Sequence, residues 1–264
     1  MAKSSLGIWV AGARPRTLPA AVAPVLVASA LAGSAFNPVT ASLALLVSLA
    51  LQVGVNYAND YSDGIRGTDN DRIGPVRITA DGLASPARVR NAAFIAFFVA
   101  ACAGLALAFE TSWWLIAVGA ICIAAAWGYT GGKNPYGYMG LGEIFVFIFF
   151  GLVATVGTFY VQAEEITGQS ILAGTIVGLL ACAILVINNI RDRAKDEVVG
   201  KRTMAVRIGD RRSRAFYTFL VIAPYLLTAG FGTPWVALTA VTLPMTISIL
   251  KSLWSGIQGA QLIA

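Results

Sequence analysis

Eight apolar runs, each of roughly 17–22 residues, occupy most of this chain and limit what it can fold into. A run of that length crosses the hydrocarbon layer of a bilayer as one α-helix. The runs are apolar on all sides and do not alternate in polarity, which excludes the strands of a membrane β-barrel. We therefore predict an all-α polytopic transmembrane bundle with spans near residues 18–36, 40–57, 91–109, 113–129, 141–161, 170–190, 215–231 and 235–251.

Composition supports the membrane assignment and narrows the chemistry. Of the 264 residues, 57% are apolar or aromatic and only 12% are charged, so a soluble domain would lack the polar residues to cover its surface. Histidine is absent, which excludes imidazole acid–base catalysis and histidine-ligated metals. Cys102, Cys122 and Cys182 lie in apolar runs without CxxC spacing, so neither a zinc cluster nor a disulfide framework is expected.

The charged residues are concentrated on one side of the predicted membrane. All 19 Lys and Arg residues lie in the N-terminal segment, in segments 58–90, 130–140 and 191–214, or at Lys251, which alternating spans place on one face. The opposite face carries only Glu110, Glu164 and Glu165. By the positive-inside rule, the basic face and the N-terminus are cytoplasmic. The net charge of +6 therefore reflects topology and contact with anionic lipid headgroups, and nucleic acid is not an expected partner.

Acidic motifs end the second and the sixth span. They are Asn56-x-x-Asn59-Asp60-x-x-Asp63 and Asn188-Asn189-x-x-Asp192-x-x-x-Asp196. Their matching positions, four spans apart, predict an internal repeat of two four-helix halves around a central cavity. Residues three and four apart share a helix face, so we expect two polar stripes. One stripe contains Asn56, Asp60 and Asp63, and the other contains Asn188, Asp192 and Asp196.

The stripes suggest a metal-dependent chemistry. Carboxylates this close at a membrane boundary repel one another and are partly desolvated, and cations relieve both penalties. Oxygen ligands without His or Cys select a hard ion, so Mg²⁺ fits, with Mn²⁺ as the alternative. Because Mg²⁺ is commonly shared between carboxylates and substrate phosphates, two such stripes indicate a diphosphate bridged by metal ions. The competing interpretation is a pair of solvated helix ends neutralised by neighbouring arginines.

Basic residues surround both motifs. They are candidates to bind phosphate, because guanidinium groups bind phosphate through paired hydrogen bonds. They are Arg66, Arg72 and Arg77 after the first motif and Arg191, Lys195, Lys201 and Arg202 around the second. The Gly- and Tyr-rich segment 129–143 follows the fourth span, and its Tyr129 and Lys133 are candidates to reach the diphosphate from a third side. Solvated topology charges and a flexible interfacial turn are the alternative interpretations.

Three motifs, in this order, resemble those of the UbiA superfamily of membrane prenyltransferases. They are Asn59-Asp60-x-x-Asp63, Tyr129-x-x-x-Lys133 and Asp192-x-x-x-Asp196. The resemblance covers nearly the whole chain and implies a UbiA-type bundle as a single domain over residues 1–264. It also implies the cytoplasmic membrane of a bacterium, with the site on the cytoplasmic side. Stretches such as Gly67-x-Asp69, Arg72-x-Gly74-Pro75-x-Arg77 and residues 200–207 are most similar to the branch that prenylates 1,4-dihydroxy-2-naphthoate in menaquinone synthesis.

This resemblance implies transfer of a polyprenyl chain from polyprenyl diphosphate to 1,4-dihydroxy-2-naphthoate, with loss of CO₂, to give demethylmenaquinone. It assigns catalysis to Asp60, Asp63, Tyr129, Lys133, Asp192 and Asp196, with Mg²⁺ on the four aspartates. The candidates for substrate binding are Asn56, Asn59, Asp69, Arg72, Arg77, Asn188, Asn189, Lys201 and Arg202. Asp69 is a candidate base, and Arg77 is a candidate to hold the acceptor carboxylate.

The chain departs from the family pattern in two places. The family often has a third Asp where this chain has Gly67, and Asp69 follows two residues later. The family has nine transmembrane helices, whereas eight are visible here, so a last helix is expected to be missing.

Two alternatives of different kinds stay open. One is another acceptor within the family, namely 4-hydroxybenzoate, a chlorin, haem or a glycerol phosphate lipid. The other is a membrane cation transporter. The position of the acidic residues argues against it, because they lie at one membrane face and not at mid-depth. A CDP-alcohol phosphotransferase is not favoured, because its Asp-Gly-x-x-Ala-Arg signature is absent.

Overall fold

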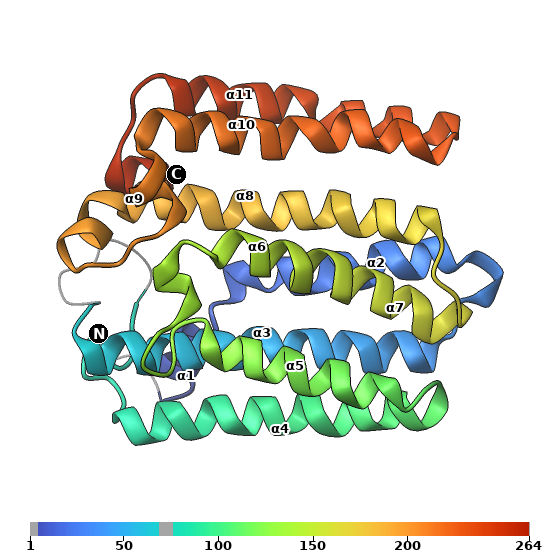
Figure 1. Ribbon diagram of the computed structural model, residues 1–264, viewed down its shortest axis with the longest axis horizontal. Coiled ribbons are helices and arrows are strands. Elements are labelled where there is room, and N and C mark those ends of the chain that lie inside the picture. The colour runs from blue at the N-terminus through green and yellow to red at the C-terminus, as the bar shows by residue number, and fades with distance from the viewer. Residues whose placement is uncertain (1–4, 69–75, 264) are drawn as a thin grey trace.

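The computed structural model describes residues 5–68 and 76–263, and all regular structure in these ranges is helical. The longer helices run nearly parallel along one axis (Figure 1). The α-helices are α1 (Ser5–Ala13), α2 (Pro19–Ala32), α3 (Pro38–Arg66), α4 (Pro86–Glu110), α5 (Trp114–Gly128), α6 (Gly142–Val146), α7 (Ala154–Ala163), α8 (Gly168–Val198), α9 (Met204–Ile208), α10 (Asp210–Leu227) and α11 (Leu243–Trp254). Short 3₁₀ segments are η1 (Pro15–Thr17), η2 (Gly33–Ala35), η3 (Tyr136–Met139), η5 (Thr228–Phe231), η6 (Pro234–Thr242) and η7 (Gly259–Ile263), and η4 (Phe147–Val153) is a π-helix.

Each predicted span corresponds to a helical segment. Within the described residues, 6 helices are long and apolar enough to cross a membrane. A further span is broken, because residues 6–17 and 19–35 meet at 51°. The eighth is the shorter apolar helix α5. The protein is therefore a multi-pass membrane protein, as the apolar runs predict.

Two helices continue well past their apolar runs. α3 starts at an Asn37 cap, whose side chain accepts hydrogen bonds from the backbone N–H groups of Val39 (2.9 Å) and Thr40 (3.4 Å). α8 starts at a capping box in which the side chains of Thr167 and Ser170 bond each other's backbone N–H. Both helices extend through their acidic motifs, and both motif ends lie at the left-hand end of the bundle in Figure 1. The acidic residues therefore lie on helix extensions and not in loops.

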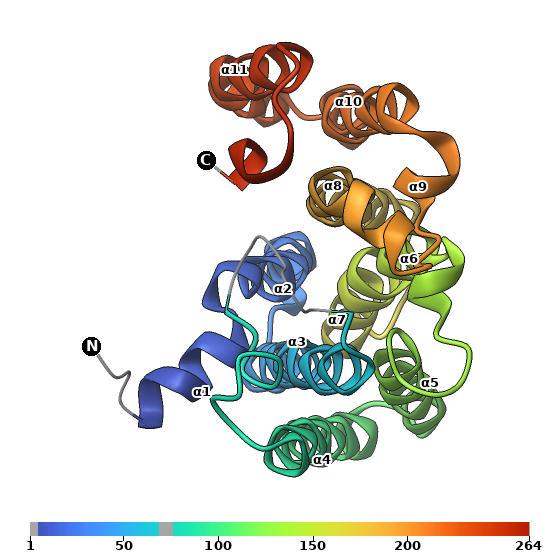
Figure 2. The ribbon, with the colours of Figure 1, turned by 90° about the vertical axis from the view of Figure 1, so that its left-hand side faces the viewer.

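The helices form two outer groups with three helices between them. The end-on view shows α3, α4 and α5 on one side, α8, α10 and α11 on the other, and α2, α6 and α7 between them (Figure 2). Small residues allow the closest helix approaches, as is common in membranes. A Cβ at Gly151 in η4 would lie 2.5 Å from the Gly178 Cα of α8, and one at Gly54 in α3 would lie 2.4 Å from the Phe97 ring of α4. Helix contacts in this bundle therefore depend on missing side chains.

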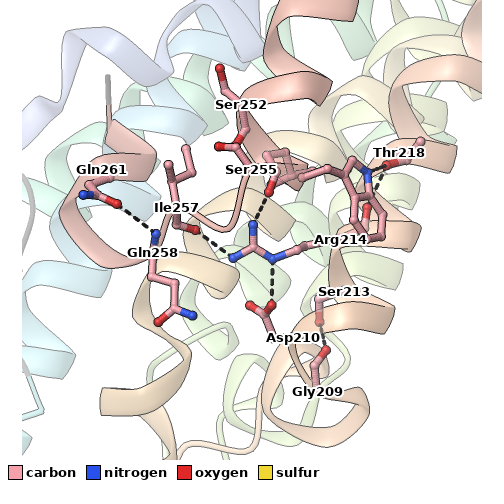
Figure 3. Close-up of polar contacts among 12 residues, drawn as sticks. Gly209, Asp210, Ser213, Arg214, Thr218, Ser252, Ser255, Ile257, Gln258 and Gln261 are labelled. Carbon is pink, nitrogen blue, oxygen red and sulfur yellow. Dashed lines mark hydrogen bonds and ion pairs between the residues drawn. The ribbon is translucent and has the colours of Figure 1, made fainter.

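A buried arginine ties the last helices together (Figure 3). Arg214 of α10 donates to the Asp210 carboxylate at 2.7 Å and to the Ile257 carbonyl at 2.8 Å, and also to the Leu253 carbonyl. These two carbonyls lie at and beyond the C-terminal end of α11, where a cation is electrostatically favoured. Arg214 therefore holds the end of α11 against the start of α10.

We predict that Gly178→Leu destabilises the bundle while Gly157→Ala does not. A leucine at position 178 must displace the backbone of η4, an overpacking that costs about 1–3 kcal/mol or more. Gly157 lies in the same broken helix as η4, and a Cβ there would meet no atom within 4 Å. Thermal unfolding in detergent measures both variants. Equal midpoints for Gly178→Leu and the wild type would contradict the close packing of α8 on η4.

Candidate active site

Asp63 is the centre of a polar cluster at the end of α3. Its carboxylate is 2% exposed, accepts a hydrogen bond from the Tyr138 hydroxyl at 2.8 Å and lies 3.7 Å from the Lys201 ammonium. The Tyr138 hydroxyl also lies 3.2 Å from the Thr68 hydroxyl. The cluster joins α3, η3 and the turn after α8, three segments that are far apart in the sequence. It brings the first acidic motif against the segment that follows the second.

Tyr138 organises the cations of this cluster. The Lys201 ammonium lies 4.7 Å, and the Arg66 guanidinium 5.5 Å, from the centre of its ring, within cation–π range. Burial, together with the nearby Asp63 carboxylate, raises the pKa of the Tyr138 phenol well above its ordinary value. The phenol therefore remains a hydrogen-bond donor to Asp63 across the physiological range. The Tyr138 carbonyl accepts from the Arg202 backbone N–H at 3.0 Å, which fixes the turn after α8 to η3.

Asp60 does not join the Asp63 cluster and instead binds the backbone of the 76–80 turn. It is fully buried, and its two oxygens accept the backbone N–H groups of Ile78 (2.9 Å) and Thr79 (2.8 Å). Asn56, expected on the same stripe, instead bonds the Ala13 carbonyl (2.9 Å) and the Thr17 hydroxyl (3.0 Å) in the N-terminal turn. The predicted Asn56, Asp60 and Asp63 stripe therefore serves three separate neighbourhoods, and only Asp63 reaches the cation cluster.

The second motif lies on the last turns of α8. Asp196 is buried, and its carbonyl accepts the Lys201 backbone N–H at 2.7 Å. Arg191 contacts both oxygens of Asp192 at 2.7 Å and also the Asn188 side-chain oxygen at 2.7 Å. This pairing neutralises Asp192, as the alternative reading of the motif expected for helix ends.

Lys201 links the ends of the two acidic motifs. Its ammonium lies 3.7 Å from the Asp63 carboxylate, and its backbone N–H donates to the Asp196 carbonyl at 2.7 Å. Glu143 of α6 is buried and accepts a hydrogen bond from the Asn189 amide of α8 at 2.9 Å. Burial raises the pKa of the nearby Tyr129 phenol strongly, and the Glu143 carboxylate raises it further.

An apolar cavity of about 300 Å³ begins at this point. Tyr129 and Asn59 belong to its lining, and Asn59 accepts a hydrogen bond from the buried Thr130 hydroxyl at 2.7 Å. Most of the wall is aliphatic or aromatic and comes from α3, α4, α5 and the broken helix α6–η4–α7. Gly104, Gly119 and Gly157 line it and leave open space where a Cβ would stand. Asn59, at the polar end of this lining, lies one helical turn before Asp63 on α3.

Several of the predicted aspartate ligands have surroundings that suit a Mg²⁺ ion. Lys201 links Asp63 and Asp196, and its ammonium beside Asp63 shows that this carboxylate is placed to receive a positive charge. Each Asp60 oxygen accepts one backbone N–H and keeps a lone pair that can bind a metal ion. Among the residues described, no three acidic side chains are grouped closely enough to hold a metal ion.

The remaining predicted residues divide into three groups. Asp69 and Arg72 lie outside the described residues. Lys133 is exposed in the loop after α5 and forms no ion pair with a residue that the structure describes. Arg77 is buried beside the turn that Asp60 holds, and Arg202 is exposed. Lys201, and not Lys133, therefore supplies the ammonium nearest to Asp63.

Sequence reasoning missed Tyr138 and Glu143 as site residues, although both belong to the Gly- and Tyr-rich segment. The available signal was their polar character within residues 137–143, where the other residues are Gly, Leu and Met. Their partners, Asp63 and Asn189, are 75 and 46 residues away, so only the folded arrangement pairs them.

The helical bundle, the paired acidic motifs and the apolar cavity define a multi-pass membrane protein with a charged cluster beside an apolar pocket. The family model described as the UbiA prenyltransferase family matches residues 21–260. The chain belongs to this family, which confirms the prediction from the three motifs.

The similar proteins include several 1,4-dihydroxy-2-naphthoate octaprenyltransferases. The chain is 48% identical to the 1,4-dihydroxy-2-naphthoate octaprenyltransferase of Mycobacterium tuberculosis, over 98% of this chain and 90% of that protein. It is 39% identical to the protein of the same description from Escherichia coli, over 85% and 76% of the two chains. In fold it resembles a UbiA homolog from Archaeoglobus fulgidus bound to DMAPP and Mg²⁺, with a TM-score of 0.67, 16% identity, and coverage of 95% and 89%.

We predict that Tyr138→Phe lowers the free energy of unfolding by about 1–3 kcal/mol, because the buried Asp63 carboxylate loses a hydrogen-bond donor. A raised pKa means that the folded state favours the neutral phenol. Its contribution to stability is therefore complete below the ordinary pKa of about 10 and is lost only as the pH rises through the higher folded value. Difference absorbance of phenolate between the wild type and Tyr138→Phe should show this titration above that of exposed tyrosines. Titration at an ordinary pKa would contradict the buried hydrogen bond.

We predict that Asp60→Ala opens the 76–80 turn while Asp63→Ala leaves it closed. The substitution removes two hydrogen bonds to a charged acceptor, each contributing about 1.5–3 kcal/mol. Arg77 is then exposed, and trypsin should cleave after it at least ten times faster than in the wild type. Mass spectrometry of the fragments identifies the cleaved bond. Equal cleavage in both variants would show that Asp60 does not hold the turn.

Proposed function

We propose that this protein transfers a polyprenyl chain from polyprenyl diphosphate to 1,4-dihydroxy-2-naphthoate. The observation that carries the proposal is that Lys201 links Asp63 to the Asp196 end of α8, one helical turn from Asn59 in the wall of the apolar cavity. A charged head and an apolar chain are the two parts of a prenyl diphosphate, and here their binding environments adjoin. The acceptor follows from relatives described as 1,4-dihydroxy-2-naphthoate octaprenyltransferases.

The diphosphate would bind among the charged residues at the ends of α3 and α8. Asp60, Asp63, Asp192 and Asp196 would hold Mg²⁺, which when bound neutralises the diphosphate and stabilises it as a leaving group. The metal is proposed on the chemistry of these donors and on the Mg²⁺-bound fold relative. Lys201 is placed to pair with a phosphate oxygen, and Arg77 and Arg202 lie on neighbouring segments.

The cavity would hold the reacting end of the chain away from water. Breaking the bond between C1 of the chain and the diphosphate oxygen leaves an allylic cation, which water would otherwise capture. The cavity walls carry few polar groups, and the rings of Tyr129, Tyr136 and Phe149 line it and can stabilise a cation through their π faces. A volume of about 300 Å³ is far too small for a long polyprenyl chain, so the rest of the chain must extend into lipid.

The aromatic acceptor completes the reaction. A ring carbon of the naphthoate forms the new bond to C1 of the chain, and the carboxylate on that carbon leaves as CO₂, so the ring regains its aromatic electron count. The raised pKa keeps the Tyr129 phenol protonated beside the site, so it can donate a hydrogen bond to the departing diphosphate. We place the site at the cytoplasmic side of the inner membrane of a bacterium, on the strength of the positive-inside distribution.

The proposed reaction is tested with purified protein in lipid nanodiscs and radiolabelled polyprenyl diphosphate. We predict Mg²⁺-dependent formation of a prenylated quinol from 1,4-dihydroxy-2-naphthoate, release of one CO₂ per turnover, and loss of at least a hundredfold in activity for Asp63→Ala. Parallel assays with 4-hydroxybenzoate, a chlorin, haem and a glycerol phosphate lipid test the other acceptors. Product from one of those compounds and none from the naphthoate would overturn the proposed acceptor. Metal flux without diphosphate release would indicate a transporter.

A further inference from the structure

Gln52 lies in the cavity wall, and its side-chain amide oxygen is buried without a hydrogen-bond donor among the described residues. It lies on the face of α3 that also presents Asn59 and Asp63, and its side chain is among the lining residues. The residue is 6% exposed. Its amide nitrogen donates to the Thr17 hydroxyl at 3.0 Å and to the Asn56 side-chain oxygen at 3.3 Å. Its amide oxygen is buried and accepts no hydrogen bond from any residue in the described ranges.

Three other polar side chains of the cavity wall have hydrogen-bond partners within the protein. The Ser48 hydroxyl donates to the Ala21 carbonyl at 2.8 Å, and the Tyr136 hydroxyl to the Ala125 carbonyl at 2.8 Å. The Asn59 oxygen accepts from Thr130 at 2.7 Å. Buried acceptors are nearly always satisfied, because an unmade hydrogen bond leaves the desolvation penalty uncompensated. The Gln52 oxygen is therefore placed for a donor that is not part of the chain.

The orientation of the amide is fixed by its neighbours. If the amide were turned over, its oxygen would face the Asn56 oxygen at 3.3 Å, and two acceptors would repel. The Thr17 hydroxyl already donates to the Arg14 carbonyl at 2.9 Å, so it has no proton left for a second acceptor. Thr17 and Asn56 therefore hold the Gln52 oxygen in its present place.

Three kinds of donor can be compared at this position. An isoprenoid chain has no donor at all. A water molecule needs two to four polar partners, whereas the neighbouring wall is apolar and the nearby polar atoms are already bonded. A hydroxyl on an aromatic ring supplies one donor on an otherwise apolar body, which matches one vacant acceptor in an apolar wall.

We propose that Gln52 is a specificity-determining residue that accepts a hydrogen bond from a ring hydroxyl of the aromatic acceptor. This inference rests on the proposed function for the identity of that acceptor. Gln52 precedes Asp63 by 11 residues on the same helix, which is about 16 Å along its axis. The diphosphate at Asp63, the reacting carbons near Asn59 and the naphthoate ring toward Gln52 would then lie in sequence along α3.

The test uses equilibrium binding, which does not require turnover. The probes are 1,4-dihydroxy-2-naphthoate and its two monohydroxy analogues, 1-hydroxy-2-naphthoate and 4-hydroxy-2-naphthoate, followed by their own fluorescence in nanodiscs. In the wild type, the analogue that lacks the bonded hydroxyl should bind about tenfold more weakly than the dihydroxy compound. Gln52→Met keeps the length of the side chain and removes the acceptor, so this difference should fall to within about twofold.

Ser48→Ala is the matched control. It removes a polar group from the same cavity wall, one helical turn from Gln52, and leaves both partners of the Gln52 amide nitrogen in place, so the tenfold difference should persist. A difference that survives in Gln52→Met, or that disappears equally in Ser48→Ala, would overturn the inference. If Gln52→Met does not fold, Gln52→Asn replaces it. Asparagine retracts the oxygen by one methylene, and an unchanged ratio in that variant would also overturn the inference.

Failure of the inference and failure of the proposed function give different results. Prenyl transfer to the naphthoate without any Gln52-dependent discrimination contradicts the inference alone. Discrimination between the analogues without prenyl transfer contradicts the proposed function and supports the Gln52 site.

Discussion

The buried carboxylates Asp60 and Asp63 at one end of the bundle need partners, and the surrounding loops supply them. A charge withdrawn from water is stable only with partners, and these two carboxylates obtain them from different segments. Asp60 takes two backbone amides from the 76–80 turn. Asp63 takes the Tyr138 hydroxyl and the Lys201 ammonium. The loops at this end therefore have defined positions although they connect helices that pack chiefly through apolar and small residues.

This condition also explains what the sequence could and could not predict. The apolar runs predict the spans, because the bilayer fixes their length and polarity, and the motifs predict which ends carry the chemistry. The roles within a motif were not predictable. Asp60 and Asp63 lie 60° apart around α3 if each residue turns by 100°, so both fit one stripe by spacing. Their functions differ because the 76–80 turn covers one and η3 covers the other, and neither contact is encoded locally.

The sequence also could not predict which basic residue lies beside Asp63. Lys133 matches the motif of the family, yet it lies exposed after α5, while Lys201 is carried to Asp63 by the turn that ends α8. That turn is held by the Lys201 amide on the Asp196 carbonyl and by the Arg202 amide on the Tyr138 carbonyl. Backbone hydrogen bonds between distant segments therefore decide which ammonium group lies beside Asp63. The spacing of residues in the sequence does not predict these bonds.

One rigid helix relates the charged cluster to the cavity. α3 continues without interruption from Pro38 to Arg66, so the distance between Gln52 at the cavity wall and Asp63 at its charged end is set by helix geometry and not by loop conformation. An aromatic ring and a diphosphate bound to the same helix are then held at a fixed separation, with the reacting carbons between them. Positioning of this kind lowers the entropy cost of bringing two substrates together, which suits a reaction that depends on placing a short-lived cation beside its acceptor.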